Sequence, residues 1–123
     1  MEVIIMIMYY DKNGKAIVYF QNKHLFNLNG KPVAFVYGNA VYNLQGRLLG
    51  YFENGWVRDK QNHAVLYSDN HSGFGPITPV HCVAPVPAVP AIPPVPPIPP
   101  VAPIPPVASA GWSSLKAEDF FNQ

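Results

Sequence analysis

The sequence predicts an all-β fold: four 16-residue β-hairpin repeats in a pseudo-four-fold closed arrangement, flower-like or propeller-like, followed by an extended polyproline tail and a short C-terminal helix. Three observations support this. Residues 9–72 divide into four blocks of sixteen that align without a gap, each block carries the same turn signal, and 14 of the 15 prolines follow Phe74. A repeat of this kind determines the architecture before any single residue does.

The chain of 123 residues is expected to hold one small folded unit with appendages. A core this small usually needs ring closure, self-association or a docked flanking segment for support. The expected parts are a four-repeat domain at 1–75 (repeats 9–24, 25–40, 41–56 and 57–72), a Pro-rich linker at 76–108 and a docking segment at 109–123.

The charge pattern argues against two classes of partner. Eight basic and seven acidic side chains leave a net charge of +1, and no dense basic cluster occurs. Nucleic acid and anionic membrane surfaces are therefore not expected as partners. The apolar stretch Val3–Met8 has no basic leader and is too short to span a bilayer, so it is interpreted as a strand. With a single cysteine, Cys82, a cytoplasmic location is expected, and export by a specialised system stays open.

Each block begins with a turn signal at its positions three and six. Position three is always Asp or Asn, and position six is Gly in three blocks and Asn62 in the fourth. An Asx side chain can accept a hydrogen bond from the backbone two residues on, and Gly or Asn tolerates positive φ. This spacing predicts a hairpin whose second arm covers positions seven to twelve, and a second turn at positions thirteen to fifteen.

Alternation along the second arm predicts which side chains form the core. Position nine is aliphatic and position eleven is aromatic in every block, so both rows are expected to face the core together. Lys15, Lys31, Arg47 and His63, at position seven, are expected at the rim. The fourth block departs most from the pattern, with Arg58 and Ser68 at apolar positions, and is the expected place of ring closure, next to the Val3–Tyr10 strand.

The blocks LFNLNGKPVAFVYGNAVYNLQGRLLGYFENGWVRDKQNHAV resemble the four-fold beta-flower proteins, a mainly bacterial family. Their paired GKPVAF and GRLLGYF arms carry the likeness, which covers about Met6 to Phe74, and the closing segment Gly111–Phe121 looks like the end of such proteins. The resemblance implies a pseudo-four-fold β architecture. It implies no established activity, so no functional residue is transferred.

The segment from Val83 to Val107 contains only Pro, Val, Ala and Ile. Such a composition favours polyproline II, and a stiff spacer is the expected role. Docking to an SH3 or WW domain through the PxxP spacings is the alternative. Ser113 to Phe121 is expected to form a short capped helix that docks on its own domain or on a partner, or else frays.

Candidate residues for catalysis are few. His63, His71, Asp59 and Asp69 fall in the fourth block, and His81 precedes Cys82, but none has the spacing of a metal site or a nucleophile with its base. No cofactor, no metal and no catalytic residue are expected.

The sequence therefore favours a non-catalytic protein-interaction or scaffolding module, which either binds a protein partner or self-associates. The alternative is a small-ligand module that binds a glycan or an anion on the symmetry axis, and an enzyme comes third. Aromatic side chains outside so small a core are the expected interaction surface. They are Tyr10, Phe20, Phe26, Tyr42, Phe52, Trp56, Trp112, Phe120 and Phe121.

Overall fold

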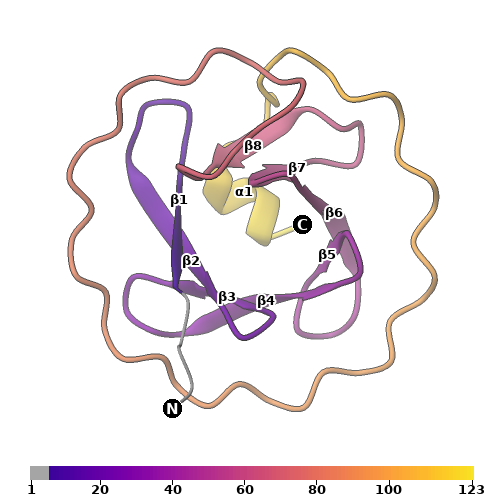
Figure 1. Ribbon diagram of the computed structural model, residues 1–123. Helices are drawn as coiled ribbons and strands as arrows, with labels where there is room; N and C mark the ends of the chain where they lie inside the picture. The colour runs from indigo at the N-terminus through magenta and orange to yellow at the C-terminus, as the bar shows by residue number, and fades with distance from the viewer. Residues whose placement is uncertain (1–5) are drawn as a thin grey trace.

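The computed structural model describes residues 6–123 and shows eight antiparallel strands in one closed barrel, which confirms the predicted all-β fold of four hairpins (Figure 1). Each strand pairs with its neighbours in sequence, and β8 pairs with β1. The elements are β1 (Ile7–Tyr10), β2 (Ala16–Gln21), β3 (His24–Asn27), β4 (Pro32–Tyr37), β5 (Ala40–Tyr42), β6 (Leu48–Glu53), β7 (Trp56–Arg58), β8 (Ala64–Tyr67) and α1 (Ala117–Phe121).

The Asx turns form as predicted in all four repeats. In the first, Asp11 Oδ1 accepts hydrogen bonds from the backbone N–H groups of Asn13 at 2.9 Å and Lys15 at 3.0 Å. The same pair of bonds recurs at Asn27, Asn43 and Asp59. Position six has positive φ each time, including 65° at Asn62, so this asparagine replaces glycine at a left-handed position.

Position nine is a β-bulge in every repeat. In the second, Leu25 pairs with Ala34 and Phe26 pairs with Pro32, so Val33 has no partner across the ladder. Ile17, Leu49 and Val65 are skipped in the same way. A bulge shifts the alternation by one residue, so positions nine and ten both face inward and position eleven faces outward. The prediction that the aromatic row shares the face of the aliphatic row is therefore corrected.

The barrel interior is filled with aliphatic side chains from positions one, nine and ten. Leu25, Val41, Val57, Leu49 and Leu66 are all buried in this one cluster. Position twelve also faces inward, and Phe20 packs against Phe52 in a tilted arrangement with ring centroids 4.8 Å apart. These residues form a continuous apolar core inside the ring.

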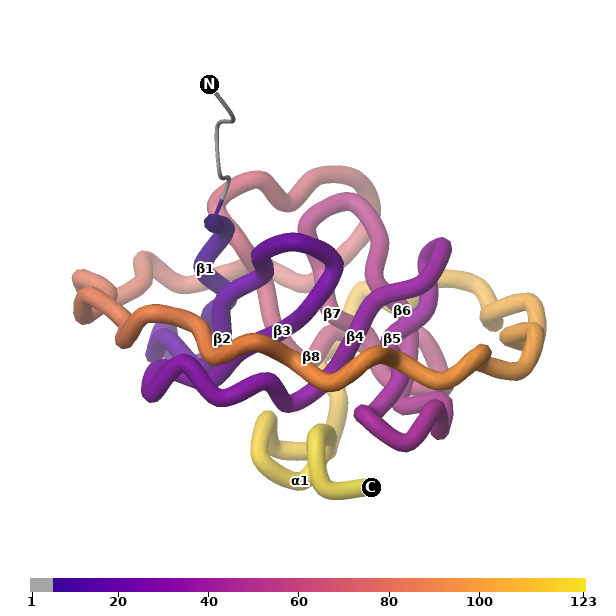
Figure 2. The backbone as a smooth tube through the Cα atoms, turned by 90° about the horizontal axis from the view of Figure 1, so that it is seen from below, coloured from indigo at the N-terminus to yellow at the C-terminus, as the bar shows by residue number. Residues whose placement is uncertain are grey.

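Helix α1 closes one end of the barrel (Figure 2). Phe120 is fully buried in the interior cluster, where Gly50 leaves room because it has no side chain. A Cβ atom on Gly50 would collide with the Arg58 carbonyl oxygen and would also lie 2.9 Å from the Phe120 ring. Of the roles left open for the C-terminal segment, the structure shows docking on its own barrel.

Ring closure occurs at the fourth repeat, as the sequence predicts. β1 and β8 share a single residue pair, Tyr10 with Tyr67. The C-terminal chain lies along β8, where Ala64 N–H donates to Gly111 O at 3.2 Å and Ser113 N–H donates to Ala64 O at 2.7 Å. The expected strand at Val3–Tyr10 is observed from Ile7, and its first residues lie outside the described part of the chain.

Residues 76–108, here called the belt, run around the outside of the barrel (Figures 1 and 2). The composition predicts a stiff spacer, whereas in the structure this segment packs against the barrel. The backbone has no helix or strand, as the prolines require, but it lies along the turns at position six of the repeats. A Cβ on Gly14 would lie 2.9 Å from His81 Cα, and one on Gly46 would lie 3.0 Å from Pro97 Cγ.

Gly30 and Gly38 provide a matched test of this packing. Both have positive φ, but a Cβ on Gly30 would collide with the Val89 carbonyl, whereas one on Gly38 meets nothing within 4 Å. We expect Gly38→Ala to cost about 1–2 kcal/mol of unfolding free energy through backbone strain alone. Gly30→Ala should cost about 1–3 kcal/mol more, because the belt must move. Urea unfolding measures both, and equal losses would contradict the packed belt.

Candidate interaction surface

Tyrosine hydroxyls hold the belt to the barrel. A proline-rich segment offers carbonyl acceptors but few N–H donors, so the barrel must supply donors. Four tyrosines do so: Tyr67 donates to Pro79 O at 3.0 Å, Tyr19 to Ala88 O at 3.1 Å, Tyr42 to Pro100 O at 2.8 Å and Tyr51 to Pro103 O at 3.1 Å. Burial raises the pKa of Tyr19, Tyr42 and Tyr67, which keeps these hydroxyls protonated as donors.

Three backbone N–H groups of the belt donate to the barrel in return. Cys82 N–H donates to Gly14 O at 2.9 Å, and Ala91 N–H donates to Gly30 O at 2.8 Å. Ala88 N–H donates to Leu28 O at 2.9 Å. These acceptors belong to the position-six turns or lie next to them, so the same turn that ends each hairpin also positions the belt.

Arg58 joins the two ends of the belt. Its guanidinium donates to Ser109 O at 3.1 Å and also to Phe74 O, and it lies 5.3 Å from the centre of the Trp56 ring. Burial lowers the pKa of Arg58, while the nearby carboxylates of Glu53 and Asp59 act in the opposite direction. Beside it, Asn62 Nδ2 donates to Pro106 O at 2.6 Å. The residues by which the fourth repeat differs from the others thus help to close the belt as well as the barrel.

The outer surface of the belt is an unbroken row of aliphatic side chains. Polyproline II has three residues per turn, so every third side chain points the same way. In almost every case, the residue that follows an outward-pointing side chain in the sequence is half-buried against the barrel. The row, here called the belt edge, is 88–98% exposed and consists of Ile77, Val80, Val83, Val86, Val89, Ile92, Val95, Ile98, Val101, Ile104 and Val107.

Most of the aromatic residues predicted as an interaction surface are covered in the structure. Tyr10, Phe26, Tyr42 and Trp56 are buried on the outward face of the barrel, and Phe120 is buried at its end. Phe20, Phe52, Trp112 and Phe121 are half-buried. The exposed apolar surface is instead the belt edge, and the signal that could have identified it is the uninterrupted Val/Ile spacing of three from Ile77 to Val107.

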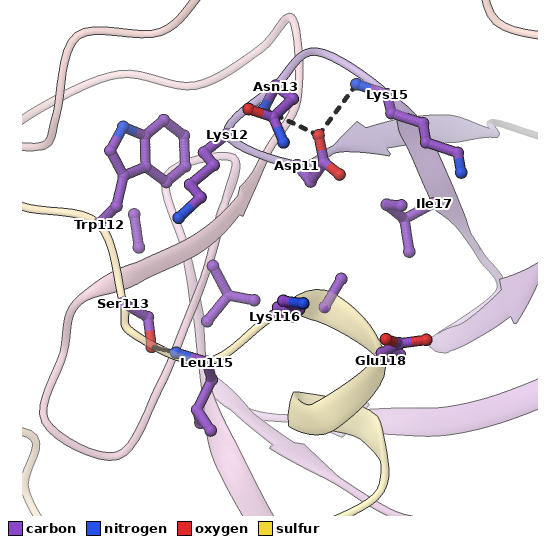
Figure 3. Close-up of a pocket in the computed structure, with 13 residues that line it drawn as sticks. Asp11, Lys12, Asn13, Lys15, Ile17, Trp112, Ser113, Leu115, Lys116 and Glu118 are labelled. Carbon is purple, nitrogen blue, oxygen red and sulfur yellow. Dashed lines mark hydrogen bonds between the residues drawn. The ribbon is translucent and has the colours of Figure 1, made fainter.

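A cavity of about 470 Å³ lies between the first Asx turn and the C-terminal segment (Figure 3). Three lysines line it, Lys12, Lys15 and Lys116, together with Trp112 and the carboxylate of Glu118. Ser113 beside them is fixed by its hydroxyl, which donates to Asp59 Oδ2 at 2.5 Å. The cavity combines three cationic groups, the two carboxylates of Asp11 and Glu118, and one aromatic ring.

The residues considered for catalysis have structural contacts. His81 Nε2 lies 2.8 Å from Asp69 Oδ1, and its Nδ1 lies 2.7 Å from Cys82 O, so both ring nitrogens face acceptors. The ring stacks on Tyr10, with centroids 3.8 Å apart. His71 contacts Trp56 and has its Nδ1 against Ser68 O. Within residues 6–123 no three His, Cys, Asp or Glu side chains lie close enough together to hold a metal ion.

The described part of the chain also contains no helix with the length and apolar character needed to cross a membrane.

Comparison with known proteins gives one positive result. A family model described as "4-fold beta flower protein" matches residues 7–121, a range that runs from β1 through the belt to α1. No curated protein matches, and no solved structure matches.

The contacts of His81 predict a pH dependence of stability. The Cys82 carbonyl raises the pKa of His81 above 6.5, partial burial opposes this, and Asp69 adds to the increase. A raised folded-state pKa means that the contribution is fully present below about pH 6.5 and is lost as the pH rises through the folded-state value. The melting temperature should therefore decrease over this range, and His81→Phe, which keeps the ring stack, should flatten the decrease. An unchanged slope in His81→Phe would contradict the assignment.

Proposed function

The chain belongs to the 4-fold beta flower family, and on that premise we propose that it is a non-catalytic interaction module that self-associates through the belt edge. The belt edge is the observation that carries the proposal. A contiguous exposed apolar surface of this extent usually marks an interface. The proposal places the module in the cytoplasm, where an exposed free thiol such as Cys82 stays reduced.

A second copy of this chain is the occupant that the charges favour. Residues 76–108 contain no Asp, Glu, Lys or Arg, and the whole chain has a net charge of +1, so little repulsion opposes association. The belt edge can meet the same edge of another copy in an isologous contact. Because tyrosine hydroxyls already hold the belt in place, less conformational entropy is lost on association than a free tail would lose.

The hydrogen bonds around the belt support a structural role, and not a catalytic one, for the histidine that precedes Cys82. His81, with an acceptor at each nitrogen, is poorly placed to act as a base toward Cys82. Docking of SH3 or WW domains at Pro90 and Pro93 is less favoured than self-association, because both prolines are half-buried against the barrel, whereas Pro94 and Pro97 are exposed.

The triple variant Val101→Ser, Ile104→Ser, Val107→Ser tests the belt edge. These side chains are 94–98% exposed, so folding stability should change little. We expect wild type to show a mass that increases with concentration in sedimentation velocity, and the serine variant to shift toward the monomer by at least about tenfold in dissociation constant.

The matched control is Val101→Ile, Ile104→Val, Val107→Ile, which keeps the edge apolar and should associate like wild type. A wild-type protein that stays monomeric up to millimolar concentration would refute self-association.

A small-ligand function is the second candidate, and the lysine-lined cavity favours it. A site on the symmetry axis is less favoured, because the tyrosine row faces the belt and α1 occupies one end of the barrel. The cavity beside Trp112 offers instead a ring for stacking and three ammonium groups for an anion. A sulfated sugar has the chemistry that such a cavity recognises.

This candidate predicts salt-dependent binding of a sulfated disaccharide, measured by calorimetry. Lys12→Ala with Lys116→Ala should weaken binding by about tenfold or more, because two charge-assisted contacts are lost. Lys60→Ala is the control, since Lys60 is exposed and does not line the cavity. Equal affinity of the double variant and wild type would remove the cavity from consideration.

A further inference from the structure

A second cavity, of about 440 Å³, lies between the belt and the hairpin of β3 and β4. Its volume falls within the range of small-molecule sites, about 300–1,000 Å³. Aromatic and proline rings dominate its lining, which includes His24, Phe35, Val36, Tyr37, Pro96 and Pro99.

The cavity lies at the one repeat that lacks a belt-binding hydroxyl at position eleven. Tyr19, Tyr51 and Tyr67 occupy this position in the other repeats and bond to belt carbonyls. The second repeat has Phe35, which is buried but has no donor. Among the described residues, 92–99 of the belt make no hydrogen bond to the barrel, and bonding resumes where Tyr42 reaches Pro100. Over this stretch the belt is therefore held by packing, such as that of Pro97 on Gly46, and not by hydrogen bonds.

His24 brings an unused acceptor to this cavity. The residue is only 9% exposed, and its Nδ1 lies 3.0 Å from Asn22 O, a geometry in which Nδ1 carries the proton and donates. Nε2 is then an acceptor, and it is buried without a partner among residues 6–123. A buried acceptor without a partner is uncommon in folded proteins and calls for an explanation.

The third repeat has a larger aromatic side chain at the position that His24 occupies in the first repeat. Trp56 occupies the same block position as His24, and its indole is buried on the outward face of the barrel. Its ring N–H donates to Ser72 O at 3.0 Å, and its ring packs against Gly75. The indole of Trp56 thus takes the place that the smaller imidazole of His24 takes in the first repeat.

We propose that the cavity binds a small neutral aromatic molecule with a single N–H or O–H donor, of the indole or phenol class. The ring lies between the aromatic side chains of β4 and the proline rings of the belt, and its donor bonds to His24 Nε2. The nitrogen is covered in this structure, so the unbonded stretch 92–99 moves outward to admit the ligand. The proposal does not rest on self-association, although Ile98 both lines the cavity and belongs to the belt edge.

Indole and N-methylindole form a matched pair of probes, because methylation removes the donor and keeps the ring, while adding one methyl group that the His24→Phe variant controls for. We expect wild-type protein to bind indole saturably, with amide NMR shifts at residues 22–24 and 35–37, and to bind N-methylindole about tenfold more weakly. The ¹⁵N resonance of His24 Nε2 should move with indole and stay unchanged with N-methylindole.

Two variants separate the contributions of the site. His24→Phe keeps a ring but removes the acceptor, so both probes should bind with the same affinity. Phe35→Tyr places a hydroxyl where the other three repeats have one, so it should bind the belt, raise the melting temperature and weaken indole binding by tenfold or more. If His24→Phe does not fold, the ratio of the two probes in wild type still decides the question.

Equal affinity of wild type for the two probes, the absence of saturable indole binding at millimolar concentration, or shifts confined to other residues would each overturn the proposal.

Discussion

The bulge at position nine is the constraint on which the rest of the structure depends. In a regular strand the aromatic row at position eleven would share a face with the aliphatic row at position nine, and both would compete for the interior of a narrow barrel. The extra residue, Val33 in the second repeat, turns the aliphatic side chain inward and leaves Phe35 and its equivalents outside. The barrel then has an aliphatic core and an aromatic outer face that needs a cover.

The belt is that cover, and its chemistry complements the aromatic face. Proline rings pack against aromatic rings, and proline carbonyls need donors that a β-sheet with all its strands paired does not provide from its backbone. Tyrosine supplies both the ring and the hydroxyl, as Tyr19 does toward Ala88. The arrangement leaves one row of side chains outside, and that row is aliphatic throughout because Val or Ile recurs at every third position from Ile77 to Val107.

Residues that depart from the repeat pattern make contacts that their equivalents in the other repeats do not make. Arg58, which replaces an aromatic residue, bonds to the chain on both sides of the belt. Gly50 replaces an interior side chain and makes room for Phe120. Phe35 lacks the hydroxyl of its equivalents, and a cavity lies beneath the belt at that repeat. Each exception is visible in the sequence, but what it accommodates comes from segments distant in the chain.

The sequence by itself determined the repeat, the Asx turn with its left-handed residue and the place of ring closure, because these depend on contacts within a few residues or on comparison of one block with the next. It did not determine which face of the sheet carries Tyr19 and its equivalents, because an aliphatic residue in a bulge looks the same in the sequence as one in a regular strand. Only the tertiary structure decided that residues 76–108 encircle the barrel and that the belt edge is the exposed apolar surface. Composition set the extended backbone of the belt, but its path depends on hydroxyl donors tens of residues away along the chain.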